Sequence, residues 1–327
     1  MKKCLFLLLS LLLSFVSVFP VYAASGHEQN GMDGWELSLK RFTADCLGKD
    51  KTTVAEEILL GLGFDENLIS SLSVEKKMEI YDAKQIQTVT EYGRVSENET
   101  ETPITEEEFL EEAAWLENSS TEIQPMAQGD RWEYSSEDSL FKKMLAVFET
   151  KNAPKGTFGI LLGYSWKNFA ARYRGEDVIS ISGEHLSFDR DTFSATAHYT
   201  YTQTTAQGST GHSRTDYVNS TNIEDENKLK QDANAIAYQF NLPNNIYTLQ
   251  APLIYSTADF LITVSAGIDL PEQVVQFNIY GKYFHQSLWL GSFLVNIDIS
   301  GVNVSVSPSL VYKTYSIQTN KKIKYIP

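Results

Sequence analysis

Apolar residues recur along the chain with two different periods, and the change between them divides the sequence. Over residues 32–90 they recur every three or four positions, which is the spacing of amphipathic helices. We expect four short helices there, with Thr52 or Thr53 capping the second and Ser73 capping the fourth. Residues 86–92 alternate instead, which predicts a strand at the end of this region.

From about residue 157 onward, polar and apolar residues alternate one by one, as in half-buried β-strands. The clearest strand covers residues 192–202. Its apolar side carries Phe193, Ala195, Ala197, Tyr199 and Tyr201, and its polar side carries Ser194, Thr196, His198, Thr200 and Thr202. A glycine-rich turn then predicts a polar return strand over residues 212–221. Further strands at intervals of roughly ten residues are typical of a sandwich or barrel.

Between these regions, residues 93–130 are rich in acidic and polar residues and poor in apolar ones, as a linker is. Thr105 followed by Glu108 forms a capping box, which predicts one short helix within the linker. We therefore expect an α+β protein: a small helical N-terminal region (24–92), an acidic linker, and a mainly antiparallel β-sandwich or barrel-like domain (131–327).

The first residues have the pattern of an export signal. Lys2 and Lys3 precede an apolar and serine run over residues 5–19, about 15 residues long, and small residues follow it. The run is shorter than the roughly 20 apolar residues that a membrane-spanning helix needs. We expect residues 1–23 to be a signal peptide and the mature chain to begin near Ala24, so that the protein is secreted or associated with the cell envelope.

Charge and cysteine content narrow the class of protein further. The formal net charge is -15, and residues 91–138 carry fifteen acidic residues against Arg94 and Arg131. Such acidity, without a basic stripe, excludes nucleic acid as a partner. Cys4 lies in the predicted signal peptide, which leaves Cys46 alone. An exported chain without a cysteine pair favours a bacterial source, and a lone cysteine on an apolar helix face is more often a core residue than a nucleophile.

Catalytic motifs do not stand out in the sequence. It contains no G-x-S-x-G, H-E-x-x-H, paired C-x-x-C or phosphate-loop pattern, so we assign no catalytic residue and no cofactor, and an enzyme is not the leading expectation. His198 and His212 fall on facing strands and could hold a metal together with Asp216. Histidines on the polar face of a surface strand are common, however, and we expect no metal.

Acidic side chains offer two candidate glycosidase pairs. One combines Glu184 with Asp189 or Asp191, and the other combines Glu176 with Asp177. Such a pair needs two carboxyl groups roughly 5 to 10 Å apart across a cleft. Acids beside turns are usually solvated turn residues, and this interpretation is the simpler one here.

Aromatic residues are abundant, at 12% of the chain, and gather in the second half. Exposed aromatic rings stack on sugars or anchor protein contacts, whereas buried rings fill a core. On the first interpretation, the candidate ligand-binding residues are Tyr164, Trp166, Tyr173, Tyr283 and Trp289. On the second, the same residues pack inside the sandwich.

The overall layout resembles a class of uncharacterised exported proteins of Gram-positive bacteria. The residues that carry the resemblance are Leu62-Gly63-Phe64, Leu68-Ile69, Leu72 and the segment Tyr283-Phe284-His285-Gln286. The resemblance covers the greater part of the chain. It implies an exported location and a helical region followed by a β region, and it implies no activity.

Three hypotheses follow for function. The first is an exported, non-enzymatic β-rich protein that binds a glycan or a protein partner at the cell surface through loops at the sheet ends. The second is a pore-forming or membrane-acting protein that uses the hairpin over residues 192–221, although Arg214 and Asp216 would make its lipid-facing side poor. The third is a secreted hydrolase with a helical pro-region. We favour the first.

Overall fold

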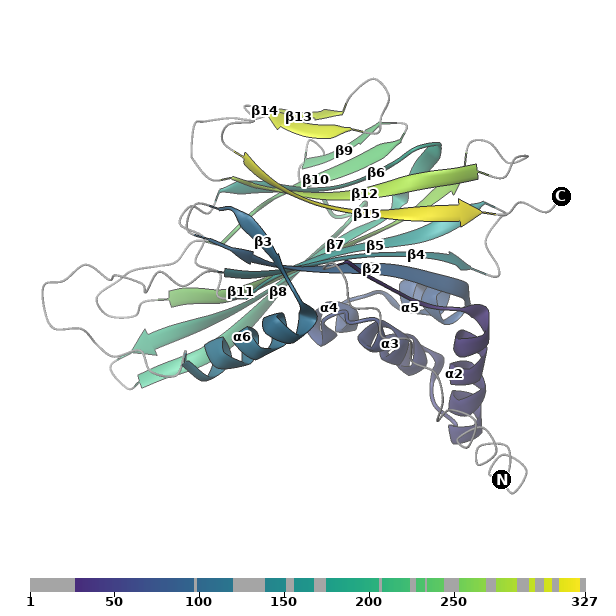
Figure 1. Ribbon diagram of the computed structural model, residues 1–327, viewed down its shortest axis with the longest axis horizontal. Helices are drawn as coiled ribbons and strands as arrows, with labels where there is room; N and C mark the ends of the chain where they lie inside the picture. The colour runs from purple at the N-terminus through teal and green to yellow at the C-terminus, as the bar shows by residue number, and fades with distance from the viewer. Residues whose placement is uncertain are drawn as a thin grey trace, which may run out of the picture.

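The computed structural model describes most of the chain after the predicted signal peptide. The described residues are 27–96, 99–119, 139–150, 156–167, 175–205, 208–223, 228–232, 234–243, 253–268, 275–286, 294–297, 303–307 and 312–323. The predicted signal peptide lies outside them. Residues 97–98 and 120–130 of the predicted linker and residues 131–138 of the predicted β domain also lie outside them. The described elements form stacked layers, with helices under one sheet and a second sheet above it (Figure 1).

The larger sheet is antiparallel and runs β1-β2-β4-β5-β11-β7-β8, with β3 paired to β2. Its strands are β1 (His27–Met32), β2 (Ala83–Val95), β3 (Glu101–Ile104), β4 (Ser139–Thr150), β5 (Thr157–Lys167), β7 (Leu186–Thr205), β8 (Gly208–Asn219) and β11 (Leu253–Ile268). The predicted strand and its return strand are β7 and β8, which pair as a hairpin. Phe193, Ala195 and Tyr199 on the predicted apolar side are buried in the main core, as alternation requires.

The smaller sheet is also antiparallel, in the order β15-β12-β6-β10-β9. Its strands are β6 (Glu176–Gly183), β9 (Leu229–Asp232), β10 (Ala235–Asn241), β12 (Val275–Gln286) and β15 (Tyr312–Ile323). A further pair, β13 (Leu294–Ile297) with β14 (Val304–Ser307), covers the outer face of this sheet through Val295, Val304 and Val306. The two main sheets are open and stacked, which confirms the sandwich prediction. The described strands do not close into the barrel-like alternative.

The main core lies between the two sheets and is largely aromatic. Phe141 of β4 contacts Trp166 with ring centroids 4.1 Å apart, and Tyr315 of the smaller sheet at 4.8 Å. Tilted and edge-on contacts of this kind add to the burial of apolar area, which is the main force holding two sheets together. β15 also contacts β2 of the larger sheet, where Gln87 Nε2 donates to Thr319 Oγ1 at 3.0 Å.

The predicted helical region folds into four helices on the other face of the larger sheet. They are α2 (Gly34–Leu47), α3 (Lys51–Gly61), α4 (Glu66–Ser70) and α5 (Val74–Tyr81). Ser73 caps α5 as predicted, but Asp50 caps α3 in place of Thr52 or Thr53. The Asp50 carboxylate accepts from Thr52 N at 2.9 Å, because an acidic side chain suits the positive end of a helix.

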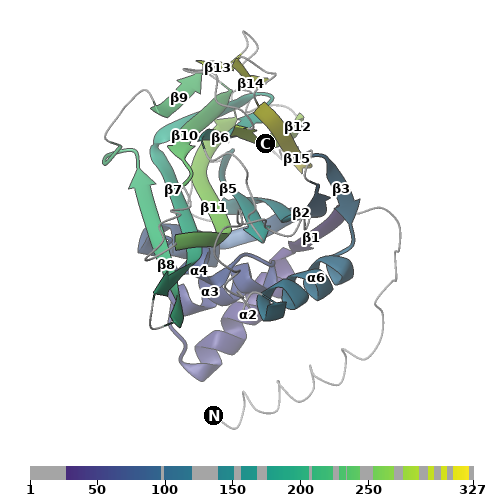
Figure 2. The ribbon, with the colours of Figure 1, turned by 90° about the vertical axis from the view of Figure 1, so that its left-hand side faces the viewer.

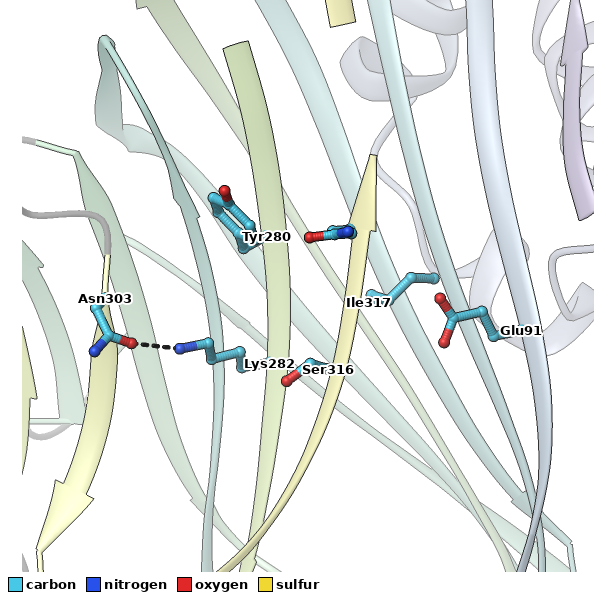
Figure 3. Close-up of a pocket in the computed structure, with 7 residues that line it drawn as sticks. Glu91, Tyr280, Lys282, Asn303, Ser316 and Ile317 are labelled. Atoms are coloured by element: carbon cyan, nitrogen blue, oxygen red, sulfur yellow. Dashed lines mark hydrogen bonds between the residues drawn. The ribbon is translucent and has the colours of Figure 1, made fainter. Parts of the chain in front are cut away.

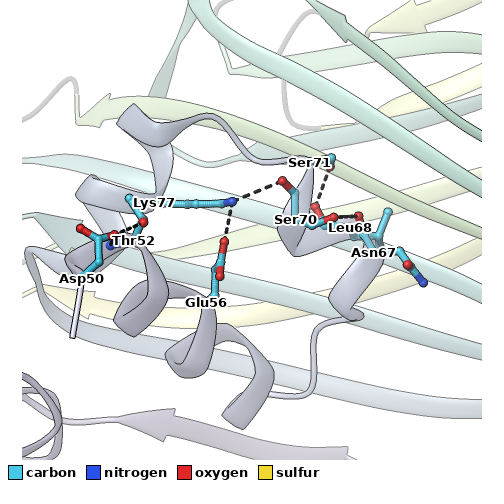
Figure 4. Close-up of polar contacts among 8 residues, drawn as sticks. All are labelled: Asp50, Thr52, Glu56, Asn67, Leu68, Ser70, Ser71 and Lys77. Carbon is cyan, nitrogen blue, oxygen red and sulfur yellow. Dashed lines mark hydrogen bonds and ion pairs between the residues drawn. The ribbon is translucent and has the colours of Figure 1, made fainter. Parts of the chain in front are cut away.

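Contacts between these helices are partly polar. Lys77 of α5 donates to Glu56 of α3 at 2.7 Å and to the carbonyl of Ser70 at 3.2 Å, which ties three helices together (Figure 4). Beneath them, Ile58 and Leu59 pack in one core with Ala146 and Leu161 of the sheet. The helices and the larger sheet therefore share a core.

The region predicted as a linker contains regular structure that pairs with the sheet. The predicted boundary at residue 92 falls inside β2, and β3 lies within the predicted linker. The predicted short helix is α6 (Glu106–Ser119), and its capping box is present: Thr105 N donates to Glu108 Oε2 at 2.8 Å, and Glu108 N donates to Thr105 Oγ1 at 3.2 Å. Phe109 of α6 packs on Tyr92 of β2 with ring centroids 5.1 Å apart.

Candidate functional site

A cleft of about 530 Å³ lies on the outer face of the smaller sheet, within the size range of small-molecule sites. β12 and β15 form its floor. Their register places Tyr280 directly opposite Gln318 and Lys282 directly opposite Ser316, so two neighbouring cross-strand pairs present four side chains on one face. Figure 3 shows these strands with Asn303 on one side and Glu91 on the other.

The polar groups of the cleft are held in place by contacts on both sides. Lys282 Nζ donates to Asn303 Oδ1 at 2.6 Å and to the carbonyl of Val304 at 3.2 Å, which joins β12 to the start of β14. On the opposite side, Glu91 is nearly buried and faces Lys143. The cleft therefore combines one aromatic ring with amide, hydroxyl, ammonium and carboxylate groups on a fixed floor.

Next to Glu91, on that side of the cleft, the buried Lys143 connects the two sheets. Lys143 Nζ of β4 lies 2.8 Å from Glu91 Oε2 and 2.7 Å from Glu101 Oε1, and it donates to the carbonyl of Ser316 at 3.2 Å. A buried ammonium group needs these three acceptors, because the hydrogen bonds that it loses to water must be replaced by contacts with the protein. Lys143 thereby joins β4 to β2 and β3 of the same sheet and to the cleft segment of β15 in the smaller sheet.

Three of the five predicted ligand-binding aromatics are in the main core. Tyr164, Trp166 and Tyr283 expose 1%, 3% and 0% of their surface, while Tyr173 and Trp289 lie outside the described residues. This burial favours the second interpretation of these residues, in which they pack inside the sandwich core. Burial also raises the pKa of Tyr164 and Tyr283 well above the ordinary tyrosine value. Their assignment to ligand binding stays a prediction.

The buried aromatics nevertheless position the cleft. Tyr164 donates its hydroxyl to the carbonyl of Tyr315 at 3.3 Å, and Trp166 meets the Tyr315 ring edge-on at 5.4 Å. Tyr315 directly precedes Ser316, so these contacts fix the strand that lines the cleft. Successive side chains of a strand point to opposite faces. Tyr280 is three positions from Tyr283, which points into the core, so Tyr280 points to the outer face and the cleft.

One of the predicted acid pairs leads to a buried polar cluster. Asp177 of β6 is fully buried and accepts from the Tyr283 hydroxyl, from the backbone N–H of Gln286 at 3.0 Å, and contacts His285 Nδ1 at 2.9 Å. Both its oxygens are used inside the fold, and Glu176 is its neighbour in the strand, so their side chains point to opposite faces. This carboxylate holds β6 to β12.

The second predicted acid group lies around the β6–β7 turn. Glu184 follows the end of β6, and Asp189 and Asp191 lie in β7. Asp189 Oδ1 accepts from the backbone N–H of Asp191 at 3.1 Å, which is a local turn contact. Neither predicted pair is among the described residues that line the cleft.

The strand register separates the three residues predicted as possible metal ligands. His198 lies opposite Thr215, and its Nδ1 lies 2.8 Å from Thr215 Oγ1. His212 lies opposite Tyr201 and stacks on that ring at 5.4 Å, and Asp216 lies opposite Ala197. Since Ala197 and Tyr201 belong to the other side of β7, His212 and Asp216 face away from His198. No group of three metal-binding side chains occurs in the part of the chain that the structure describes.

A polar row that the sequence did not reveal crosses the helix-covered face of the larger sheet. Ser165, Asp259 and His198 are consecutive cross-strand neighbours in β5, β11 and β7. The Ser165 hydroxyl donates to Asp259, which is buried, and burial raises the pKa of that carboxyl. Sequence alternation placed His198 on a polar face, but only the strand order shows that Asp259 lies beside it.

Comparison with known proteins gives no family. No protein-family model matches the chain, and no curated protein matches it. Among the described residues, none of the helices is both long and apolar enough to cross a bilayer. In its described residues the chain is a β-rich protein with two main antiparallel sheets, a two-stranded sheet beside the smaller one, and helices on the other face of the larger one.

Solved structures show only weak likeness. The collagen-binding subdomain of the Enterococcus faecalis surface protein ACE aligns at a TM-score of 0.23 and 10% identity, covering 51% of this chain and 91% of that one. A structure described as a pore forming protein aligns at 0.22 and 8%, covering 59% and 96%. Clostridium perfringens delta-toxin aligns at 0.20 and 6%, covering 73% and 94%. At such TM-scores the likeness carries no argument about function.

Proposed function

We propose that this protein is exported and binds a glycan at the cell surface through the cleft on the smaller sheet. The observation that carries the proposal is the arrangement of Tyr280, Gln318, Lys282 and Ser316 as two adjacent cross-strand pairs facing the cleft. A sugar ring presents an apolar face to an aromatic ring and hydroxyl groups to amide, hydroxyl and ammonium groups. The cleft offers both kinds of contact on rigid strands.

Several features of the cleft suit binding. Lys282 is held by Asn303 and the backbone, and β15 is held by Lys143, so little side-chain motion must be lost when a ligand binds. The opposing charges of Glu91 and Lys282 leave the cleft close to neutral in an acidic protein. This balance favours an uncharged ligand such as a neutral or N-acetylated sugar over a polyanion.

The pore-forming alternative has weaker support. In β8, Arg214 and Asp216 lie opposite Tyr199 and Ala197, on the side of the hairpin where β7 is apolar. A membrane-inserted hairpin would expose that side to lipid, where an arginine costs roughly 2–4 kcal/mol at the bilayer midplane and an aspartate adds a smaller cost. The hydrolase alternative has no acid pair in the cleft to support it, because Glu91 is the one carboxylate among the described residues that line it.

Glycan binding is testable on purified protein. The probe is an array of neutral, N-acetylated and acidic oligosaccharides, followed by calorimetry with the best of them. Tyr280→Ala should weaken binding about tenfold or more, since a stacking ring contributes roughly 1 kcal/mol beyond the area it covers. Trp35→Ala is the matched control, because Trp35 is an exposed aromatic on α2, outside the cleft. Absence of any sugar binding, or equal loss in both variants, would count against the proposal.

Export is tested separately by mass spectrometry of the protein recovered from the culture medium and the cell envelope. A chain that begins near Ala24 supports the signal-peptide prediction and export. A chain that retains its first residues, or that stays inside the cell, contradicts export without bearing on the cleft. A chain that begins near residue 130 would indicate that the helical region is a pro-region and would favour the hydrolase or toxin alternative.

A further inference from the structure

The edge strand β8 of the larger sheet is long and exposed. In the described part of the chain it pairs with β7 on one side and with no strand on the other (Figure 2). Residues 208–215 are all exposed. A row of unpaired backbone N–H and C=O groups is a template for another strand, and natural proteins normally block such an edge with lysines, prolines, bulges or a covering element.

β8 differs in this respect from the other long edge. β15, at the edge of the smaller sheet, carries three lysines and reaches the larger sheet through Gln87 and Thr319. β8 contains neither lysine nor proline, and its charged residues are Arg214 and Asp216, which cancel. In a protein with a net charge of -15, this strand adds no net charge of its own to a contact between two copies.

The two charged residues are spaced so that the strand is complementary to itself. Arg214 and Asp216 lie on the same side of β8, one residue before and one after Thr215. In an antiparallel pair of identical strands centred on Thr215, each residue faces the one equally distant on the other side of the centre. Arg214 of one copy then lies opposite Asp216 of the other, and this happens twice across the two-fold axis.

We propose that two copies of this chain associate through β8, antiparallel, with the two-fold axis between their Thr215 residues. The two larger sheets then form one continuous sheet across the dimer. Within one chain Arg214 Nη2 lies 2.7 Å from Asp216 Oδ2, and the two side chains are 55% and 41% exposed, so both charged groups remain at the surface, where a second copy can share them. Backbone hydrogen bonds supply affinity, and the two charge pairs select the register.

Charge reversal with rescue tests this register. Arg214→Asp places like charges opposite each other at both contacts, and so does Asp216→Arg. Each should raise the dimer dissociation constant at least about tenfold, since two opposed pairs change sign together. The double variant Arg214→Asp/Asp216→Arg restores both contacts with reversed polarity and should return the constant to within about threefold of the parent chain. Sedimentation velocity over a range of concentrations measures all four proteins.

A cysteine crosslink tests the same geometry independently of charge. Thr215→Cys, in a chain with Cys4 and Cys46 replaced by serine, brings two thiols face to face, because directly opposed residues have Cα atoms roughly 4.5–5.5 Å apart. Ser213→Cys is the matched control. In the proposed register its two copies are offset by four residues, roughly 13 Å, which is too far for a disulfide.

The outcomes separate clearly. Three results together support the proposal. Dimerisation is lost in both single charge variants, it is restored in the double variant, and Thr215→Cys traps the dimer as a disulfide. A parent chain that stays monomeric at about 100 µM, a generous upper concentration for a specific dimer, overturns it. A dimer that is unaffected by charge reversal, or that Ser213→Cys traps as well as Thr215→Cys does, places the interface or the register elsewhere and also overturns it. Circular dichroism and thermal unfolding check that each variant is folded.

Discussion

The hydroxyl of Tyr283 donates a hydrogen bond to the carboxylate of Asp177, and both side chains are completely buried. The two residues are 106 positions apart in the sequence and lie on neighbouring strands of the smaller sheet. His285 and the backbone of Gln286 complete the shell around the carboxylate. From the sequence, Tyr283 is a candidate ligand-binding residue. In the fold, its hydroxyl supplies a hydrogen bond to a carboxylate buried inside the sandwich.

Replacing this acid should destabilise the fold. Asp177→Asn keeps the shape of the side chain but removes the charge and one acceptor, so part of the surrounding donor set is left without a partner. We expect a loss of about 3 kcal/mol in the free energy of unfolding, measured by urea denaturation. Asp191→Asn, at an exposed position in β7, should change it by less than about 0.5 kcal/mol. Equal effects of the two substitutions would contradict the role of Asp177.

The buried carboxyl of Asp259 should make stability depend on pH. Burial raises its pKa above the ordinary value of 3.8, so the folded protein holds this proton more tightly than the unfolded chain. The stabilisation from protonation is fully present below pH 3.8 and is lost as the pH rises through the native pKa. The difference in unfolding free energy, parent minus Asp259→Asn, should therefore fall as the pH rises. A difference that stays constant or increases between about pH 3 and 8 would refute this.

Loss of Lys143 should loosen the junction between the sheets. Lys143→Met removes the partner of Glu91 and Glu101 and leaves two poorly solvated carboxylates. We expect a loss of about 3 kcal/mol in the free energy of unfolding. Lys84→Met is the matched control, because Lys84 pairs with Glu149 at the surface, where such a pair contributes at most about 1 kcal/mol. Thermal unfolding of both variants measures the contrast, and similar losses would argue against a buried ion cluster.

A close approach between strands makes Gly159 of β5 sensitive to substitution. A Cβ atom at this position would lie 2.1 Å from Cζ of the Phe148 ring, which is itself fully buried. Gly159→Ala must displace the ring and should cost about 1–3 kcal/mol. Gly211→Ala should be close to neutral, because a Cβ there would meet no atom within 4 Å other than those of its own residue and its two chain neighbours. Chemical denaturation distinguishes them, and an equally tolerated alanine at residue 159 would contradict this packing.

Local patterns in the sequence predicted local features of the fold. Thr105 and Glu108 form the predicted capping box, and Phe193, Ala195 and Tyr199 face the core as their alternation requires. These features depend on residues within one turn or one strand, and sequence spacing alone specifies them. The α3 cap was predicted at Thr52 or Thr53 and lies at Asp50, because several capping residues compete within a few positions.

Features that depend on register and strand order were not predictable in the same way. The sequence placed His198 and His212 on facing strands, but the pairing of His198 with Thr215 sends His212 to the other side of the hairpin. A shift of one residue exchanges the two sides of a strand, so chemistry between strands cannot be read from alternation alone.

The sequence by itself determined the run of helices that follows β1, the β-rich remainder, and the inward and outward sides of its clearest strand, because period and capping are properties of neighbouring residues. Only the tertiary structure decided that β2 and β3 belong to the sheet, that Tyr280 faces a cleft and Tyr283 the core, and that β8 is an edge in the described part of the chain. The physical reason is that sheet pairing joins residues far apart in the sequence, through long-range burial that no local pattern encodes.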